Sequence, residues 1–225
     1  YMQPQPLVNQ MEGWMERHGV PRLTAPEMAR GSMGMLDKVA ARQPDVSLGG
    51  GERLKVGDFE FEVIWTPGHA PGHICLYEPN RKLLMSGDHI LPTITPNVSR
   101  HAQTAGNPLS DYMKSLEKVA DLDVEILLPA HEFDTRDLKG RIAEIRRHHD
   151  ERLEEMERCI GDGATAWEVA SRVKWTTGML ADFEPFMQRA AVGETLAHLE
   201  YLHELGRIAV HDSSEEGAVV TWTRS

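Results

Sequence analysis

The sequence predicts an α+β fold, because a block of short strands lies between two helix-rich regions. Residues 59–65 alternate apolar and acidic side chains, which is typical of a half-buried strand, and shorter apolar runs follow at 74–77 and 83–86. Residues 1–48 and 134–160 instead repeat apolar residues every three or four positions, which is the helical period.

The remaining elements follow in chain order. Residues 1–48 predict two or three short helices, the last of them over 28–42. Gly57 and Asp58 form a turn between Val56 and the strand at 59–65, as in a hairpin. A helix is predicted over 110–122, and the apolar run 124–128 predicts a strand in the centre of the sheet. The long helix carries one apolar stripe from Leu138 to Ile160 that includes His149, so this face should be buried.

Residues 164–225 predict a helix, a second helix and a hairpin, in that order. Thr165 is placed to cap the first of these helices, and the second spans 186–205. The two strands are expected at 207–210 and 218–223. This order resembles a winged helix, and the domain boundary is expected inside or just after the long helix that precedes it.

The composition argues against some classes of partner. Acidic residues outnumber basic ones by 35 to 24, which gives a net charge of −11 and disfavours binding to nucleic acid. No apolar run approaches the roughly 18 residues of a membrane span, so no membrane partner is expected. The two cysteines, Cys75 and Cys159, fit no metal spacing and suit a reducing cytoplasm, which is the expected location.

Three predicted strands each end in a loop with metal-binding residue types. The loops read TPGHAPGH at 66–73, SGDH at 86–89 and PAHE at 129–132. Rigid strand ends can hold ligands in tight geometry, while the glycines and prolines shape the loops. Imidazole and carboxylate groups suit zinc, and also iron or manganese.

With these three motifs the sequence resembles the metallo-β-lactamase-fold hydrolases, the superfamily that includes glyoxalase II. The resemblance covers residues from about 50 to the end of the chain and implies the second half of an αββα sandwich. It implies that His69 binds one metal ion, that His131 binds a second, and that Asp88 bridges the two as the catalytic carboxylate. His73 and His89 lie beside these ligands and are candidates for hydrogen bonding to them or for contact with substrate. The implied cofactors are two divalent metal ions, zinc first, with iron or manganese as alternatives.

The resemblance also implies a domain division. Residues 1–150 are expected to form a partial hydrolase domain, and residues 161–225 a winged-helix-like domain. The expected hydrolase domain consists of a helical insert at 1–48, the sheet and metal loops at 49–135, and a helix at 136–160 that runs past its end.

The family's upstream motif, H-x-H-x-D-H, is absent from the sequence. The nearest cluster, His148-His149-Asp150, falls within the long helix and is expected on its surface. Two explanations are open: the chain is the carboxyl-terminal part of a longer hydrolase, or it is a relative that has lost catalysis. The first is favoured because the three remaining motifs are intact and the chain starts at Tyr1, and it predicts an exposed apolar sheet surface.

The leading functional hypothesis is a metal-dependent hydrolase in which a metal-activated hydroxide attacks an ester, thioester or lactone bond of a small-molecule substrate. The chain alone is expected to be inactive. A nuclease is the first alternative, but residues 164–225 carry a net charge of −4, which disfavours it. The second alternative is a non-catalytic assembly module, for which a homodimer is considered.

Overall fold

The computed structural model describes residues 4–33, 42–213, 215 and 217–225. The chain divides into two units. The sheet unit comprises Gln43–Val98 and Thr104–Glu151. The helical unit comprises the described part of Tyr1–Arg42, together with Ser99–Gln103 and Arg152–Ser225. The N-terminal helices thus group with the C-terminal part of the chain, whereas residues 1–48 are expected from the sequence to belong to the first domain.

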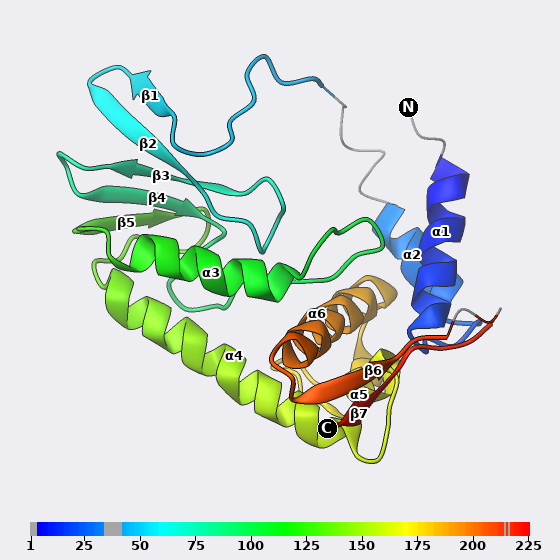
Figure 1. The fold of residues 1–225 in the computed structure, drawn as a ribbon. Helices are drawn as coiled ribbons and strands as arrows, with labels where there is room; N and C mark the ends of the chain where they lie inside the picture. The colour runs from blue at the N-terminus through cyan, green and yellow to red at the C-terminus, as the bar shows by residue number, and fades with distance from the viewer. Residues whose placement is uncertain (1–3, 34–41, 214, 216) are drawn as a thin grey trace. The chain divides into compact units, whose positions relative to one another are not determined.

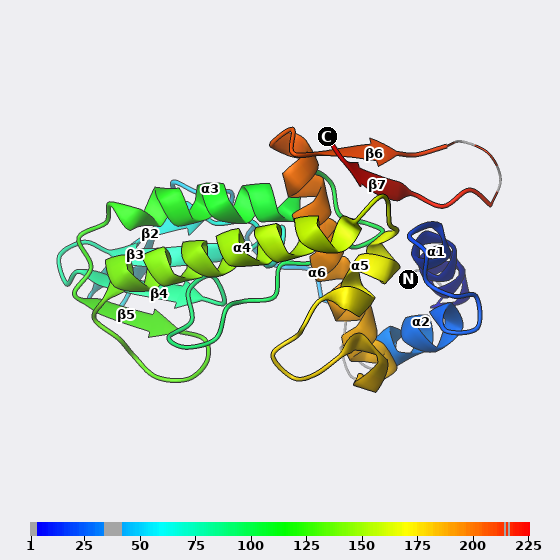
Figure 2. The same ribbon diagram turned by 90° about the horizontal axis from the view of Figure 1, so that it is seen from below.

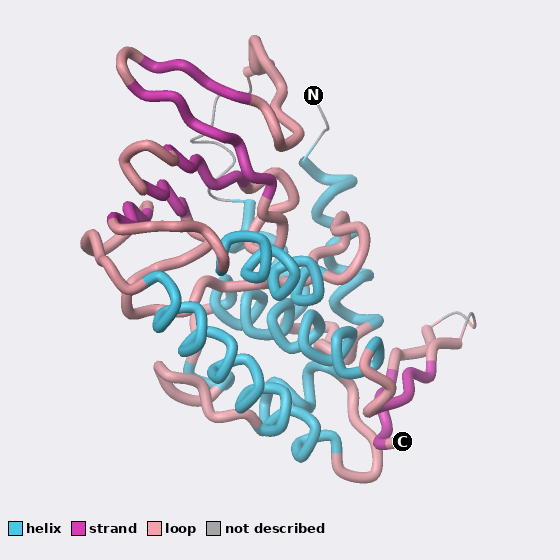
Figure 3. The backbone as a smooth tube through the Cα atoms, turned by 60° about the vertical axis from the view of Figure 1, so that its left-hand side comes forward, coloured by secondary structure: helices cyan, strands magenta, loops and turns pink. Residues whose placement is uncertain are grey.

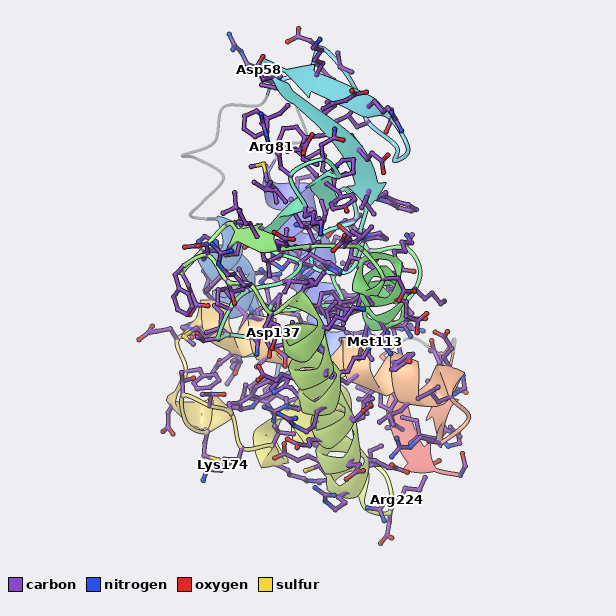
Figure 4. The ribbon with its side chains drawn as sticks, turned by 90° about the vertical axis from the view of Figure 1, so that its left-hand side faces the viewer. Asp58, Arg81, Met113, Asp137, Lys174 and Arg224 are labelled. Carbon is purple, nitrogen blue, oxygen red and sulfur yellow. The ribbon has the colours of Figure 1, made fainter. Side chains whose placement is uncertain are left out.

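The sheet unit contains five strands that neighbour one another in chain order (Figure 1). They are β1 (Arg53–Val56), β2 (Phe59–Trp65), β3 (Ile74–Glu78), β4 (Leu83–Gly87) and β5 (Ile126–Pro129). β1 to β4 pair in antiparallel fashion, and β4 and β5 pair in parallel. The predicted hairpin at Gly57 and Asp58 is confirmed, and Asp58 lies at its tip (Figure 4).

Two helices, α3 (Pro108–Ala120) and α4 (Leu138–Ile160), lie on the same side of the sheet (Figures 1 and 2). α4 begins in the sheet unit and ends in the helical unit. α3 begins two residues before the predicted start, because the Asn107 side chain accepts hydrogen bonds from the backbone N–H groups of Leu109 and Ser110.

The face of the sheet beneath these helices is buried at β3, β4 and β5. The pairs Ile64–Cys75, Tyr77–Leu84 and Leu84–Leu127 define this face, and Cys75, Leu84 and Leu127 have no exposed surface. The Tyr77 hydroxyl donates to the carbonyl of Asp123, just beyond α3. This face therefore forms the core of the sheet unit.

The opposite face is apolar and partly exposed. Its register runs through Val63, Leu76, Met85 and Leu128. Four large apolar side chains of the sheet strands are more than one third exposed: Val56, Phe59, Trp65 and Met85. The expected exposure of apolar sheet surface is therefore observed in the sheet unit.

Two local predictions in the sheet unit were wrong. The apolar run before Pro129 does not form a central strand, because β5 lies at the end of the described sheet. Part of its outer edge is covered by Thr135, which exchanges two backbone hydrogen bonds with Leu127. His149 is buried, with its ring 5.5 Å from that of Tyr112. Its burial agrees with its place in the apolar stripe of α4 and contradicts the surface position expected for the cluster at 148–150.

The helical unit contains helices and one hairpin (Figure 3). Its elements are α1 (Pro4–Arg17), α2 (Ala25–Met33), α5 (Ala166–Arg172), the 3-10 helix η2 (Leu180–Asp182), α6 (Pro185–Glu204), β6 (Ile208–His211) and β7 (Thr221–Arg224). Thr165 caps α5 as predicted, and Glu168 returns the hydrogen bond in a capping box. The predicted helix over 28–42 is observed as far as Met33, and residues 34–41 lie outside the described residues.

The α5, α6, hairpin order matches the predicted order of elements, while the winged-helix class itself stays a prediction. Across the described ranges, none of the helices has the length and apolar character that crossing a membrane requires.

Candidate functional site

The three motif loops meet because of the direction of their strands. β2 and β4 are both antiparallel to β3, so they point the same way, and β5 is parallel to β4. The carboxyl ends of β2, β4 and β5 therefore lie at the same end of the sheet. The residues that follow them include His69, Asp88 and His131, which we call the strand-end site.

Asp88 lies between the two imidazoles of the strand-end site. Its Oδ1 is 3.1 Å from Nε2 of His131, and its Oδ2 is 4.0 Å from Nε2 of His69. The side chain of Asp88 is 32% exposed and that of His69 is 36% exposed, so solvent reaches both groups. The carboxylate thus presents one oxygen to each imidazole.

A backbone contact fixes the orientation of the His69 ring. Nδ1 of His69 is 2.8 Å from the carbonyl oxygen of Asn97. Because a carbonyl can only accept, Nδ1 carries the proton. The Nε2 lone pair of the neutral ring is then available on the side that faces Asp88.

His73 supports Asp88 through the backbone of its loop. Nε2 of His73 accepts the backbone N–H of Asp88 at 3.1 Å, so its proton is on Nδ1, which lies 2.8 Å from Oγ1 of Thr66. Burial lowers the pKa of His73, and the nearby His69 adds to this effect. His73 therefore contacts the loop of Asp88 through a hydrogen bond, and its contact with substrate stays a prediction.

His89 does not face the solvent side of the site. Its side chain is fully buried, and its ring packs edge-on against Tyr112 with centroids 5.0 Å apart. Burial lowers the pKa of His89 to about 3, so the ring is neutral at pH 7. The structure therefore leaves His89 no surface for substrate contact and places it in the packing beneath the site.

Two glycines allow the loops to approach their neighbours. Gly68 has a φ of +144°, and a Cβ there would lie 2.5 Å from Cβ of Tyr112. Gly87 has a φ of +54°, and a Cβ there would lie 2.6 Å from Nε2 of His73. A larger residue at either position would displace the loop that carries a candidate ligand.

Polar side chains of α3 bind the backbone of the loops. The Tyr112 hydroxyl donates to the His89 carbonyl at 2.8 Å, and the Ser115 hydroxyl donates to the Pro67 carbonyl at 2.8 Å. Nζ of Lys118 donates to the Trp65 carbonyl at 3.0 Å. Sequence reasoning missed these three residues, although their spacing of three along a helix could have indicated a shared face.

Glu132 and Arg141 bind the segment that follows Asp88. Sequence reasoning also missed the roles of these two residues. Glu132 accepts hydrogen bonds from the hydroxyl and the backbone N–H of Thr93. These bonds lower the pKa of Glu132. Arg141 donates to the carbonyls of Leu91 at 2.6 Å and Ile94 at 2.9 Å. Residues 91–94 are thus bound from two sides.

The distances within the strand-end site are compatible with part of a metal centre. Two ligands of one tetrahedral zinc, each about 2.0–2.2 Å from it, lie about 3.3–3.6 Å apart. The two distances from Asp88 to the imidazoles, 3.1 and 4.0 Å, fall on either side of that value. Among the residues that the structure describes, no group of three or more His, Cys, Asp or Glu side chains could hold a metal ion by itself.

Comparison with known proteins finds similarity to one superfamily, by sequence and by structure. A family model described as the metallo-beta-lactamase superfamily matches residues 9–131, which is more than half of the chain. A solved metallo-beta-lactamase family protein from Thermus thermophilus is 30% identical, with a TM-score of 0.81 over 99% of this chain and 66% of its own. A beta-lactamase domain protein from Burkholderia ambifaria is 28% identical, with a TM-score of 0.74 over 98% of this chain and 61% of its own.

A curated relative has a named activity. The acyl-coenzyme A thioesterase MBLAC2 of Homo sapiens is 33% identical over 98 residues, which are 42% of this chain and 33% of that protein. The chain spans less than half the length of the curated relatives to which we compared it.

Proposed function

Because the chain belongs to the metallo-β-lactamase superfamily, we propose that it forms part of the catalytic unit of a metal-dependent hydrolase. The observation that carries the proposal is the Asp88 carboxylate between His69 and His131, at the shared end of three strands. A carboxylate in this position would hold bound dications and lower the repulsion between them.

The proposed roles follow from the contacts of each side chain. His69 offers Nε2, because Asn97 holds the proton on Nδ1. Asp88 offers one oxygen to each side, and its backbone N–H is held by His73. His131 offers Nε2 from the loop after β5. Bound divalent cations, zinc first, would supply hydroxide near neutral pH and polarise the bond to be cleaved.

We propose that the remaining ligands come from a part of the protein outside this sequence. Three side chains are too few for two metal ions, since one catalytic zinc commonly takes three protein ligands. The short span of the chain relative to its curated relatives supports this.

The proposed substrates are small molecules with an ester, thioester or lactone bond. The named thioesterase among the relatives makes a thioester the first class to test. These bonds share a carbonyl carbon that hydroxide can attack.

The first experiment measures zinc binding to the chain by competition with a chelating dye. We expect weak binding that Asp88→Asn and His131→Gln abolish. His211→Gln is the matched control, because His211 lies on β6 in the helical unit. Equal zinc binding by the wild type and D88N would contradict the proposed metal site.

The second experiment uses the longest natural form of the protein, loaded with zinc, and a panel of acyl thioesters, esters and lactones. Hydrolysis should be lost in D88N and retained in H211Q. A fully metallated wild-type protein that hydrolyses none of these substrates would overturn the hydrolase proposal.

A further inference from the structure

Glu132 directly follows the candidate ligand His131, yet its carboxylate is already engaged. Oε2 accepts the backbone N–H of Thr93 at 2.9 Å, and more distantly that of Ile94 at 3.5 Å. Oε1 accepts the hydroxyl of Thr93. Both oxygens therefore bind the segment after Asp88, which makes Glu132 a poor candidate for a metal ligand or a general base.

The backbone of Glu132 is arranged for this contact. Its φ is +71°, in the left-handed region that non-glycine residues rarely adopt. Thr93 is separated from Glu132 by 39 positions in the sequence, so the contact closes a long loop. A strained backbone that persists at such a contact indicates that the surrounding structure holds it in place.

The segment bound by Glu132 also contacts His69. It runs from Leu91 to Asn97 and contains two prolines, Pro92 and Pro96, which restrict its backbone. Arg141 holds the carbonyls of Leu91 and Ile94 from α4. The segment ends at Asn97, whose carbonyl oxygen accepts a hydrogen bond from Nδ1–H of His69.

We propose that Glu132 is a positioning residue that holds residues 91–97 so that Asn97 keeps His69 in its Nδ1-protonated form. One carboxylate then connects the loop of His131 with the ring of His69, so the two imidazoles on either side of Asp88 are positioned together. The inference rests on the proposed function only in taking His69 as a metal ligand.

The test measures the tautomer of His69 in the metal-free chain at pH 8, where a typical imidazole is neutral. Nitrogen-15 shifts of the ring report which nitrogen carries the proton. We expect the Nδ1-protonated form in the wild type and a mixture of both tautomers in Glu132→Ala. Amide exchange at Thr93 and Ile94 should rise at least about tenfold in that variant. The ring signals of the buried His149 should not change.

Three further variants sharpen the test. Glu132→Gln keeps one acceptor oxygen and should give an intermediate result. Thr93→Val removes one of the two donors of Thr93 and should shift the tautomer in the same direction. Glu117→Gln is the matched control, because Glu117 lies on α3 and pairs with Arg146 of α4 instead. If E132A does not fold, E132Q and T93V decide the question.

Zinc affinity provides a separate readout, and we expect E132A to weaken it about 10- to 100-fold. A wild-type chain that binds no zinc would count against the proposed function, while the tautomer result would still decide this inference. His69 retaining its Nδ1 proton in E132A, whether or not the amides exchange faster, would overturn the positioning role.

Discussion

The imidazole of His73 occupies the space into which a side chain at Gly87 would extend. A Cβ at Gly87 would lie 2.6 Å from Nε2 of His73 and 3.1 Å from Cε1. The same Nε2 accepts the backbone N–H of Asp88. The lack of a side chain at position 87 therefore allows His73 to hold the residue that supplies the carboxylate of the strand-end site.

We predict that Gly87→Ala destabilises the sheet unit and displaces His73. The clash and the positive φ together should lower the free energy of unfolding by about 2–4 kcal/mol, measured by urea denaturation. Gly57→Ala is the control, because Gly57 also has a positive φ, +59°, but no heavy atom lies within 4 Å of its Cβ position. Equal losses in the two variants would show that the contact with His73 contributes little.

The loop TPGHAPGH provides a second matched pair of glycines. A Cβ at Gly68 would lie 2.5 Å from Cβ and 2.7 Å from Cα of Tyr112, whereas one at Gly72 would meet nothing within 4 Å. We expect Gly68→Ala to lower the free energy of unfolding by about 3 kcal/mol or more, and Gly72→Ala to change it by less than about 1 kcal/mol. Urea denaturation of both variants measures this, and a mild effect of G68A would contradict the close packing of the loop on α3.

Local patterns in the sequence predicted most of the sheet unit. The alternation in β2 and the glycine-containing motifs after β2 and β4 are properties of neighbouring residues, so they identify both the strands and the loops. The direction of the strands then brings the motifs to one end of the sheet.

The contacts that orient the candidate ligands could not be predicted in this way. Glu132 binds Thr93, and Arg141 binds Leu91, across 39 and 50 positions of the sequence. A polar side chain that binds a distant backbone leaves no periodic pattern near it. The position of β5 at the end of the sheet depends on which strands pair with each other, and the local sequence does not reveal this. β5 is apolar because residues such as Leu127 are buried, not because the strand is central.

We predict that the hydroxyl of Tyr112 stabilises the loop after β4. Tyr112 is fully buried, and its hydroxyl donates to the His89 carbonyl. Tyr112→Phe would leave this buried carbonyl without that donor and should lower the free energy of unfolding by about 1–3 kcal/mol. Tyr77→Phe is the comparison, because its bond to the Asp123 carbonyl is only part-buried, and we expect a smaller loss. Thermal or urea unfolding of the two variants tests the order, and a larger loss in Y77F would contradict it.

We predict that His18 makes the helical unit sensitive to acid. Burial lowers its pKa to about 4, with added effects of Arg17 and Arg100, whereas the unfolded value is near 6.5. Its contribution to stability is therefore fully present above pH 6.5. As the pH falls from about 6.5 to about 4, His18 binds a proton in the unfolded chain but stays neutral in the folded chain, so stability is lost. At pH 4.5 this single residue should lower the free energy of unfolding by about 2 kcal/mol relative to pH 7.

The measurement compares the unfolding free energy of the wild type and His18→Gln at pH 7 and pH 4.5. The Gln variant lacks the titrating ring, so it should lose less stability on acidification than the wild type, whatever its stability at pH 7. His211→Gln is the control for the His→Gln change itself, because His211 is exposed on β6 and lies away from His18 in the sequence. Equal losses for the wild type and H18Q between the two pH values would show that the folded chain binds a proton at His18 as readily as the unfolded chain does.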